Sequence, residues 1–123
     1  MDDQSLLQYA HVNIPAMYGL DATLDFFERI GWDAVYGRVR ELGRHLLASA
    51  ALRRLDLVTP ADAHAGIFVV RCANDEAAQR TLAGRGVSVA ARGYGLRVSP
   101  HFYNTADEID RGLAAIAELI EAT

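Results

Sequence analysis

Hydrophobic residues recur at helical spacing in the first quarter of the chain. Between residues 14 and 30 the large apolar side chains stand three or four positions apart. This stripe comprises Met17, Leu20, Leu24, Phe27 and Ile30. Pro15 suits the first turn of a helix, and Gly31 suits the position just beyond its end. The pattern therefore predicts one helix over residues 14–30.

A second and longer helix is predicted after Trp32, with Asp33 as its N-terminal cap. Arginines and Glu41 occupy its other faces, as expected of an amphipathic helix. We expect it to run to about Leu55. Its apolar stripe consists of Val35, Val39, Leu42 and Leu46.

The hydrophobic pattern then changes to that of a small sheet. Residues 57–58 indicate the end of a strand before a turn. The run 66–72 is β-branched and almost continuously apolar, which is typical of a central strand. Residues 87–90 and 94–99 predict two further strands on either side of the Arg92-Gly93 turn.

Two further helices complete the pattern. Asn74 is the predicted cap of a short helix through Leu82. The segment 105–108 reads Thr-Ala-Asp-Glu, a capping box, and begins an amphipathic last helix. We therefore expect a single α+β domain over residues 1–123. It should hold a small antiparallel or mixed sheet of 3–4 strands with helices packed on one face.

Composition narrows the function classes. The chain has 123 residues, 51% of them hydrophobic, without the long apolar stretch of a membrane span. Its acidic start lacks the features of a secretory signal, so we expect a cytoplasmic protein. The formal net charge of −4 disfavours nucleic-acid binding. We expect no membrane and no nucleic-acid partner.

The cysteine and the helical and loop histidines predict no metal site. The single cysteine, Cys72, permits no internal disulfide and no cysteine-based metal cage. At the end of an apolar strand, Cys72 is most simply a small buried hydrophobe. His45 and His64 match no metal-ligand spacing, and we interpret both as surface residues.

Arg97 is the strongest candidate for a functional side chain. Its guanidinium is planar, stays charged near neutral pH and matches a carboxylate with two parallel hydrogen bonds. Spacing alone favours the simpler interpretation, an exposed strand arginine in a surface ion pair. His101, Tyr103 and Asn104 follow in the same segment. Asn104 is most simply a residue that positions the loop, and His101 has no partner identifiable from sequence.

Several ordered motifs carry a resemblance that covers about residues 13–121. The segment 96–105 reads Leu-Arg-Val-Ser-Pro-His-Phe-Tyr-Asn-Thr. Asn-Ile-Pro-Ala-Met-Tyr-Gly-Leu-Asp-Ala begins at residue 13, and Ile-Gly-Trp and Thr-Pro-Ala-Asp begin at residues 30 and 59. Together they resemble the C-terminal small domain of class V aminotransferases. This pyridoxal-phosphate family includes cysteine desulfurases, kynureninase and isopenicillin epimerase-like proteins.

The resemblance implies the C-terminal domain fold of fold-type I pyridoxal-phosphate enzymes. It implies that Arg97 binds the substrate carboxylate and that His101, Tyr103 and Asn104 line the site. Enzymes of the family hold the cofactor on a lysine of a preceding large domain. The chain contains no lysine, since its 12 basic residues are all arginines. We therefore expect no cofactor to be bound by this chain alone, and pyridoxal phosphate only if a large domain completes the site.

One departure bears on the cofactor. Where the family commonly has Gly-Thr, with the threonine contacting the cofactor phosphate, residues 10–13 read Ala-His-Val-Asn. This disfavours the phosphate contact. Two function classes follow: the small-domain part of an enzyme acting on an amino acid, or a free-standing, non-catalytic binding or interaction module. Accordingly, we expect a homodimer or a separate large-domain chain as partner, and a small amino-acid or carboxylate ligand.

Overall fold

The computed structural model describes residues 13–122 and divides into two compact units. The first ends at Ala34 and the second begins at Val35. Residues 10–12, where the sequence lacks the Gly-Thr pair of the family that it resembles, lie outside the described residues.

In the first unit, helix α1 (Ile14–Ile30) has the bounds that the sequence predicts. The Asn13 side chain accepts a hydrogen bond from Ala16 N at 3.2 Å, and a proline occupies the first turn. Gly31 ends the helix with φ +94°, a conformation that glycine adopts without steric cost. None of the residues of α1 is buried.

Helix α2 (Trp32–Leu52) begins and ends earlier than predicted. Trp32 is itself helical, and its ring stacks on Phe27 at a centroid distance of 4.9 Å, so Asp33 lies inside the first turn and is not the cap. The predicted end near Leu55 was also wrong. Arg54 has φ +54°, which a continuing α-helix does not allow.

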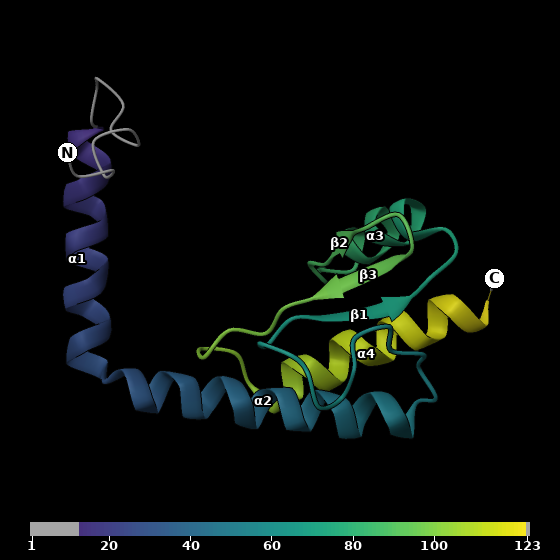
Figure 1. Ribbon diagram of the computed structural model, residues 1–123. Helices are drawn as coiled ribbons and strands as arrows, with labels where there is room; N and C mark the ends of the chain where they lie inside the picture. Colours follow the sequence, from purple (N-terminus) through teal and green to yellow (C-terminus); the bar gives the residue numbers. More distant parts are fainter. Residues whose placement is uncertain (1–12, 123) are drawn as a thin grey trace, which may run out of the picture. The chain divides into compact units, whose positions relative to one another are not determined.

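The second unit is built on an antiparallel sheet with strand order β1-β3-β2 (Figure 1). Its strands are β1 (Phe68–Arg71), β2 (Ala90–Ala91) and β3 (Gly95–Val98). Strand β3 is therefore central, and the prediction that the run 66–72 supplies the central strand was wrong. The predicted strand 87–90 contributes only its last residue to β2.

Strand β1 is paired along both of its edges. Its outer edge is covered by a short segment, because Val58 N donates to Val69 O and Arg71 N donates to Asp56 O, both at 2.8 Å. Leu57 forms an isolated bridge with Val70. The strand end predicted at residues 57–58 is thus present only as this isolated bridge and not as a regular strand.

The two remaining helices follow strands β1 and β3, respectively. Helix α3 (Asp75–Gly84) starts where predicted, but the Asn74 side chain makes no capping bond. Helix α4 (Ala106–Glu121) begins with the predicted capping box, in which Glu108 N donates to Thr105 Oγ1 and Thr105 N donates to Glu108 Oε2.

One face of the sheet carries the core. Side chains alternate between the two faces of a strand, and Phe68, Val70 and Leu96 are fully buried on the same face. Cys72 is 9% exposed, as expected of a buried hydrophobe. The helices contribute Leu42 and Leu46 from α2, Leu82 from α3, and Leu113 and Ile116 from α4. The α+β prediction, a small sheet with helices packed on one face, is confirmed.

Within the described part of the chain, no helix combines the length and the hydropathy that a membrane crossing requires.

Candidate functional site

Arg97 lies on the face of the sheet opposite the core. It is the third residue of β3, opposite Val69 on one side and Ala90 on the other. Its neighbour in sequence, Leu96, is buried, so alternation turns the Arg97 side chain to the other face. Arg97 is half-buried there, with an aliphatic residue on each flanking strand.

The Arg97 guanidinium is uncommitted within residues 13–122, where no hydrogen bond or ion pair engages it. Arg71 on the neighbouring strand provides the contrast, because its Nε lies 2.6 Å from Asp56 Oδ2. The surface ion pair that spacing alone favoured for Arg97 is therefore absent from this part of the chain. The N–H donors of the Arg97 guanidinium therefore remain available to a planar acceptor such as a carboxylate.

The loop between β3 and α4 is fixed by Asn104. Its side-chain Oδ1 accepts from His101 N at 2.8 Å, and its backbone N donates to His101 O at 2.9 Å. Its Nδ2 donates to Glu108 Oε2 at 3.2 Å. The loop-positioning role inferred for Asn104 from sequence agrees with these bonds.

Arg38 of α2 also holds this loop, a contact that sequence reasoning missed. Its Nη2 donates to Asn104 O at 3.1 Å, while Nη1 pairs with Glu41 at 2.9 Å. The two residues Arg38 and Asn104 are 66 positions apart, and no local pattern signals such a contact.

Glu108 stays ionised at this end of α4. The hydrogen bond from the Thr105 backbone, and then that from Asn104, hold the pKa of Glu108 below its ordinary value, although burial opposes them. The Arg111 charge acts in the same direction. The carboxylate that closes the capping box therefore also anchors the loop.

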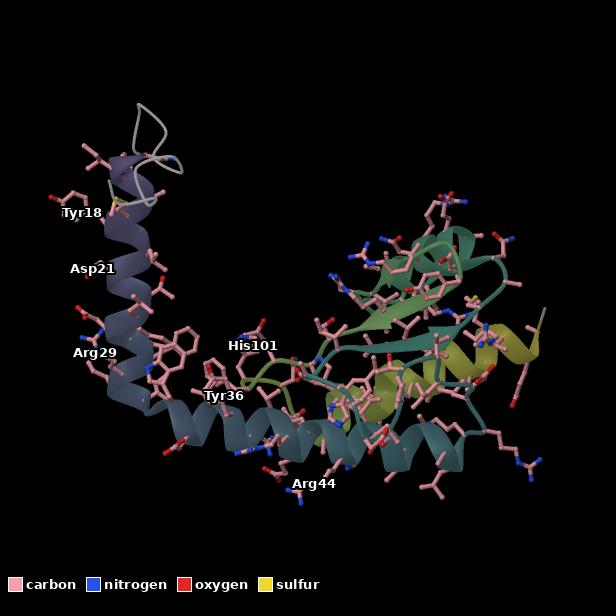
Figure 2. The ribbon with its side chains drawn as sticks, viewed as in Figure 1. Tyr18, Asp21, Arg29, Tyr36, Arg44 and His101 are labelled. Carbon is pink, nitrogen blue, oxygen red and sulfur yellow. The ribbon has the colours of Figure 1, made fainter. Side chains whose placement is uncertain are left out.

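Three rings of the loop pack on one another. The His101 ring lies 4.6 Å from that of Phe102 and 4.5 Å from that of Tyr103, measured between centroids. Phe102 and Tyr103 meet edge to face at 5.7 Å. His101 lies where the loop reaches beyond the end of the sheet (Figure 2), and Tyr103 is 72% exposed. We call these three residues the aromatic cluster.

A cleft of about 490 Å³ borders the same loop. Ser99, Pro100 and Asn104 line one side, and Arg111 and Gly112 of α4 line another. Arg97, His101 and Tyr103 are not among its lining residues. The structure therefore does not combine all four residues selected from sequence in one pocket. Asn104 faces the cleft, whereas Arg97 belongs to the open face of the sheet.

The two histidines interpreted as surface residues are both half-buried, which corrects that interpretation. His45 Nε2 lies 3.1 Å from Asp110 Oδ2, and the Ser49 hydroxyl donates to the other oxygen of Asp110. Arg53 completes this polar cluster, with Nη1 at 3.7 Å from Asp110. The cluster joins α2 to α4. His64 packs its ring on Phe68 at 4.6 Å.

The described residues contain no group of three or more histidine, cysteine, aspartate or glutamate side chains placed to hold a metal ion.

Comparison with known proteins finds similarity among solved structures only. No family model and no curated protein matches the chain. Among solved structures, a NifS-like protein superposes with a TM-score of 0.73 at 21% identity, over 95% of this chain and 36% of its own. A cysteine desulfurase from Thermococcus onnurineus NA1 gives 0.81 at 20%, over 94% of this chain and 33% of its own.

A third structure, 8-amino-7-oxononanoate synthase from Francisella tularensis, gives a TM-score of 0.60 at 19% identity, over 70% of this chain and 27% of its own. The chain thus spans about a third of the length of the structures it matches. At such identities the likeness concerns the fold. That fold is the α+β arrangement of the C-terminal domain of fold-type I pyridoxal-phosphate enzymes.

Proposed function

We propose that this chain is the small-domain part of a cytoplasmic, class V aminotransferase-like enzyme that acts on an amino acid, with Arg97 as the residue that binds the substrate carboxylate. The observation that carries the proposal is the uncommitted Arg97 guanidinium on the open face of the sheet. The fold shared with a cysteine desulfurase supports it. In this role Arg97 holds and orients the substrate through two parallel hydrogen bonds.

The residues of this chain do not fit covalent attachment of pyridoxal phosphate. A Schiff base to the cofactor requires a lysine amine, and none of the 123 residues is a lysine. The chemistry of the cofactor therefore belongs to the part of the enzyme that this chain does not supply. The contribution of the chain is binding and positioning.

The exposed apolar surface of helix α1 supports a protein partner for this chain. Its large apolar side chains are exposed, with Met17 at 58% and Leu20 at 59%. An apolar surface of this kind is typical of an interface. We propose that a large-domain chain or a second copy of this chain covers it.

A second candidate function is a non-catalytic binding or interaction module with the same fold. The missing lysine favours it, because a module needs no cofactor. The two functions differ at Arg97, since an enzyme part requires the carboxylate site and a module with another ligand does not.

The test is a titration of the protein with alanine, cysteine or kynurenine, followed through backbone amide shifts. A charge-assisted hydrogen bond contributes about 1.5–3 kcal/mol, so we expect a dissociation constant in the millimolar range at best. The shifts should centre on β3 and the loop after it.

Arg97→Lys is the matched control, because lysine keeps the charge and loses the planar fork. The substitution should weaken binding several-fold. Shifts that appear elsewhere and are indifferent to this substitution would count against the carboxylate site. They would favour the module.

A further inference from the structure

Another cavity, of about 510 Å³, lies between the exposed side of α2 and the loop before β1. We call it the α2 cavity. It shares no lining residue with the cleft beside the loop after β3. Its lining consists of Gly37, Arg40 and Arg44 from the helix and Asp62 and His64 from the loop.

The two arginines of the α2 cavity carry uncompensated charge. One helical turn separates Arg40 from Arg44, so both side chains lie on the same face of α2, where like charges repel each other. Figure 2 shows Arg44 projecting from α2 away from the sheet. Within residues 13–122, neither arginine forms an ion pair. By contrast, Arg38 of the same helix pairs with Glu41 at 2.9 Å.

His64 adds a third donor, and packing holds its ring in place. The ring lies 4.6 Å from that of Phe68 and rests on the α2 backbone at Gly43, where an added Cβ would lie 2.9 Å from His64 Cε1. Nδ1 accepts a hydrogen bond from Gly66 N at 3.4 Å, so the neutral ring carries its proton on Nε2. Among the described residues, none accepts a hydrogen bond from this N–H.

We propose that the α2 cavity binds the phosphate group of a phosphate monoester. A carboxylate presents two oxygens in one plane, whereas this phosphate presents three acceptor oxygens in a tetrahedral arrangement and a charge of about −1.5 to −2 at pH 7. Arg40, Arg44 and His64 approach from a helix and a loop, and each can donate to a different oxygen. The tetrahedral group therefore matches the donors better than the planar one.

Asp62 limits the affinity of this site. Its carboxylate lines the same cavity, so it repels an anion bound there. Two arginines and one aspartate leave one net positive charge when His64 is neutral. Binding is therefore weak, and removal of the Asp62 charge should strengthen it. The site does not include Arg97, so it stands or falls separately from the proposed carboxylate site.

The test compares three anions: methyl phosphate, dimethyl phosphate and acetate. Dimethyl phosphate carries the diester group of lipids and nucleic acids, and acetate is the planar anion. Each is titrated into the full chain at constant ionic strength and at about pH 7.5, where the monoester is largely dianionic. Backbone amides and histidine ring protons are followed by NMR. We expect methyl phosphate to bind about tenfold more tightly than the other two, with shifts centred on residues 40–44 and 62–66.

Substitutions within the cavity should change this affinity in opposite directions. Arg40→Gln and Arg44→Gln should each weaken binding of methyl phosphate about tenfold, because each removes charge-assisted hydrogen bonds. His64→Phe keeps a ring on Phe68 and loses the donor, so it should weaken binding by a smaller factor. Asp62→Asn should strengthen binding.

Arg80→Gln is the matched control, because Arg80 is exposed on α3 and lines none of the cavities of the described residues. It removes the same charge and should leave the affinity unchanged. Equal weakening by Arg80→Gln and Arg40→Gln means general charge attraction and overturns the proposal. Equal binding of dimethyl phosphate or of acetate overturns the monoester, and so does the absence of saturable binding of methyl phosphate.

Discussion

Arginine residues of this chain differ in whether they find a partner, and that difference guides the functional proposal. Arg71 and Arg97 lie on the same face of the sheet, on paired strands. Arg71 is neutralised by Asp56, whereas Arg97 meets only Val69 and Ala90 across the strands. The sequence identified Arg97 through its motif. The pairing of Arg71 depends on a fold-back of 15 residues that no local pattern signals.

A buried carboxylate, Asp75, was also missed from the sequence. Asp75, 6% exposed, accepts hydrogen bonds from the backbone N–H groups of Arg92, Gly93 and Gly95 at 2.6–3.2 Å. Burial raises the pKa of Asp75, but these bonds outweigh it and the net pKa lies below the ordinary value. From sequence Asp75 is only an acidic residue in a first helical turn. Its role as the anchor of the β2–β3 turn appears once the fold brings them together.

Asp110 should make stability depend on pH. The hydrogen bond from Ser49 is the largest cause that lowers the pKa of Asp110; burial opposes it, while His45 and Arg53 add to the lowering. A carboxylate with a lowered pKa stabilises the fold above its unfolded pKa, about 3.9, and loses that contribution as pH falls through the folded value. We expect Asp110→Asn to lower the melting temperature at pH 7.

The difference between Asp110→Asn and the unsubstituted protein should shrink as the pH falls below about 4. Thermal denaturation across pH 2.5–7 measures it, a range set by the reference pKa of about 3.9. Asp62→Asn, in the loop before β1, serves as control and should show little effect at any pH. A difference for Asp110→Asn that stays constant down to the lowest pH contradicts the prediction.

Secondary-structure elements with explicit end signals were predicted best. Proline and glycine bracket α1, and the capping box fixes the start of α4, so both were located from the sequence. The end of α2 was missed because it depends on the positive φ of Arg54, which a non-glycine residue does not announce. Strand order was missed because β1 gains its second neighbour from residues 56–58, outside any regular strand.

Thr105→Ala should destabilise both α4 and the loop that carries the aromatic cluster. The hydroxyl accepts from Glu108 N at 3.2 Å, and its loss leaves an N–H of the first turn without a partner. Loss of such a cap costs about 0.5–2 kcal/mol in the free energy of unfolding. Chemical denaturation measures this loss, and amide shifts of residues 101–104 should report the loosened loop.

Thr81→Ala is the matched comparison, because the Thr81 hydroxyl only donates to Ala77 O within α3. It should cost less than the change at Thr105. Equal losses for the two variants, or unchanged shifts in the loop, would argue that the capping box does not position the aromatic cluster.

At the scale of the whole molecule, the sequence motifs predict the fold. The proposed function rests on the Arg97 guanidinium, which has no hydrogen-bond or ion-pair partner within residues 13–122. The fold that the resemblance implies agrees with structural neighbours at 19–21% identity, a range in which fold persists and activity is not implied. Arg97 and its loop could be selected from one segment, since they are contiguous. The Arg38 contact and the stacking of the rings required the three-dimensional structure.

Helix α1 should mediate self-association. Its exposed Met17, Leu20 and Leu24 line an apolar groove of about 490 Å³, and burying one leucine side chain is worth roughly 1.5–3 kcal/mol. We expect sedimentation to show a concentration-dependent dimer. Leu20→Gln should weaken it by about tenfold or more. Leu52→Gln, at a side chain that is 84% exposed at the end of α2, should leave it unchanged. A protein that stays monomeric at the highest concentration excludes a second copy as the partner of α1, and leaves the large-domain chain.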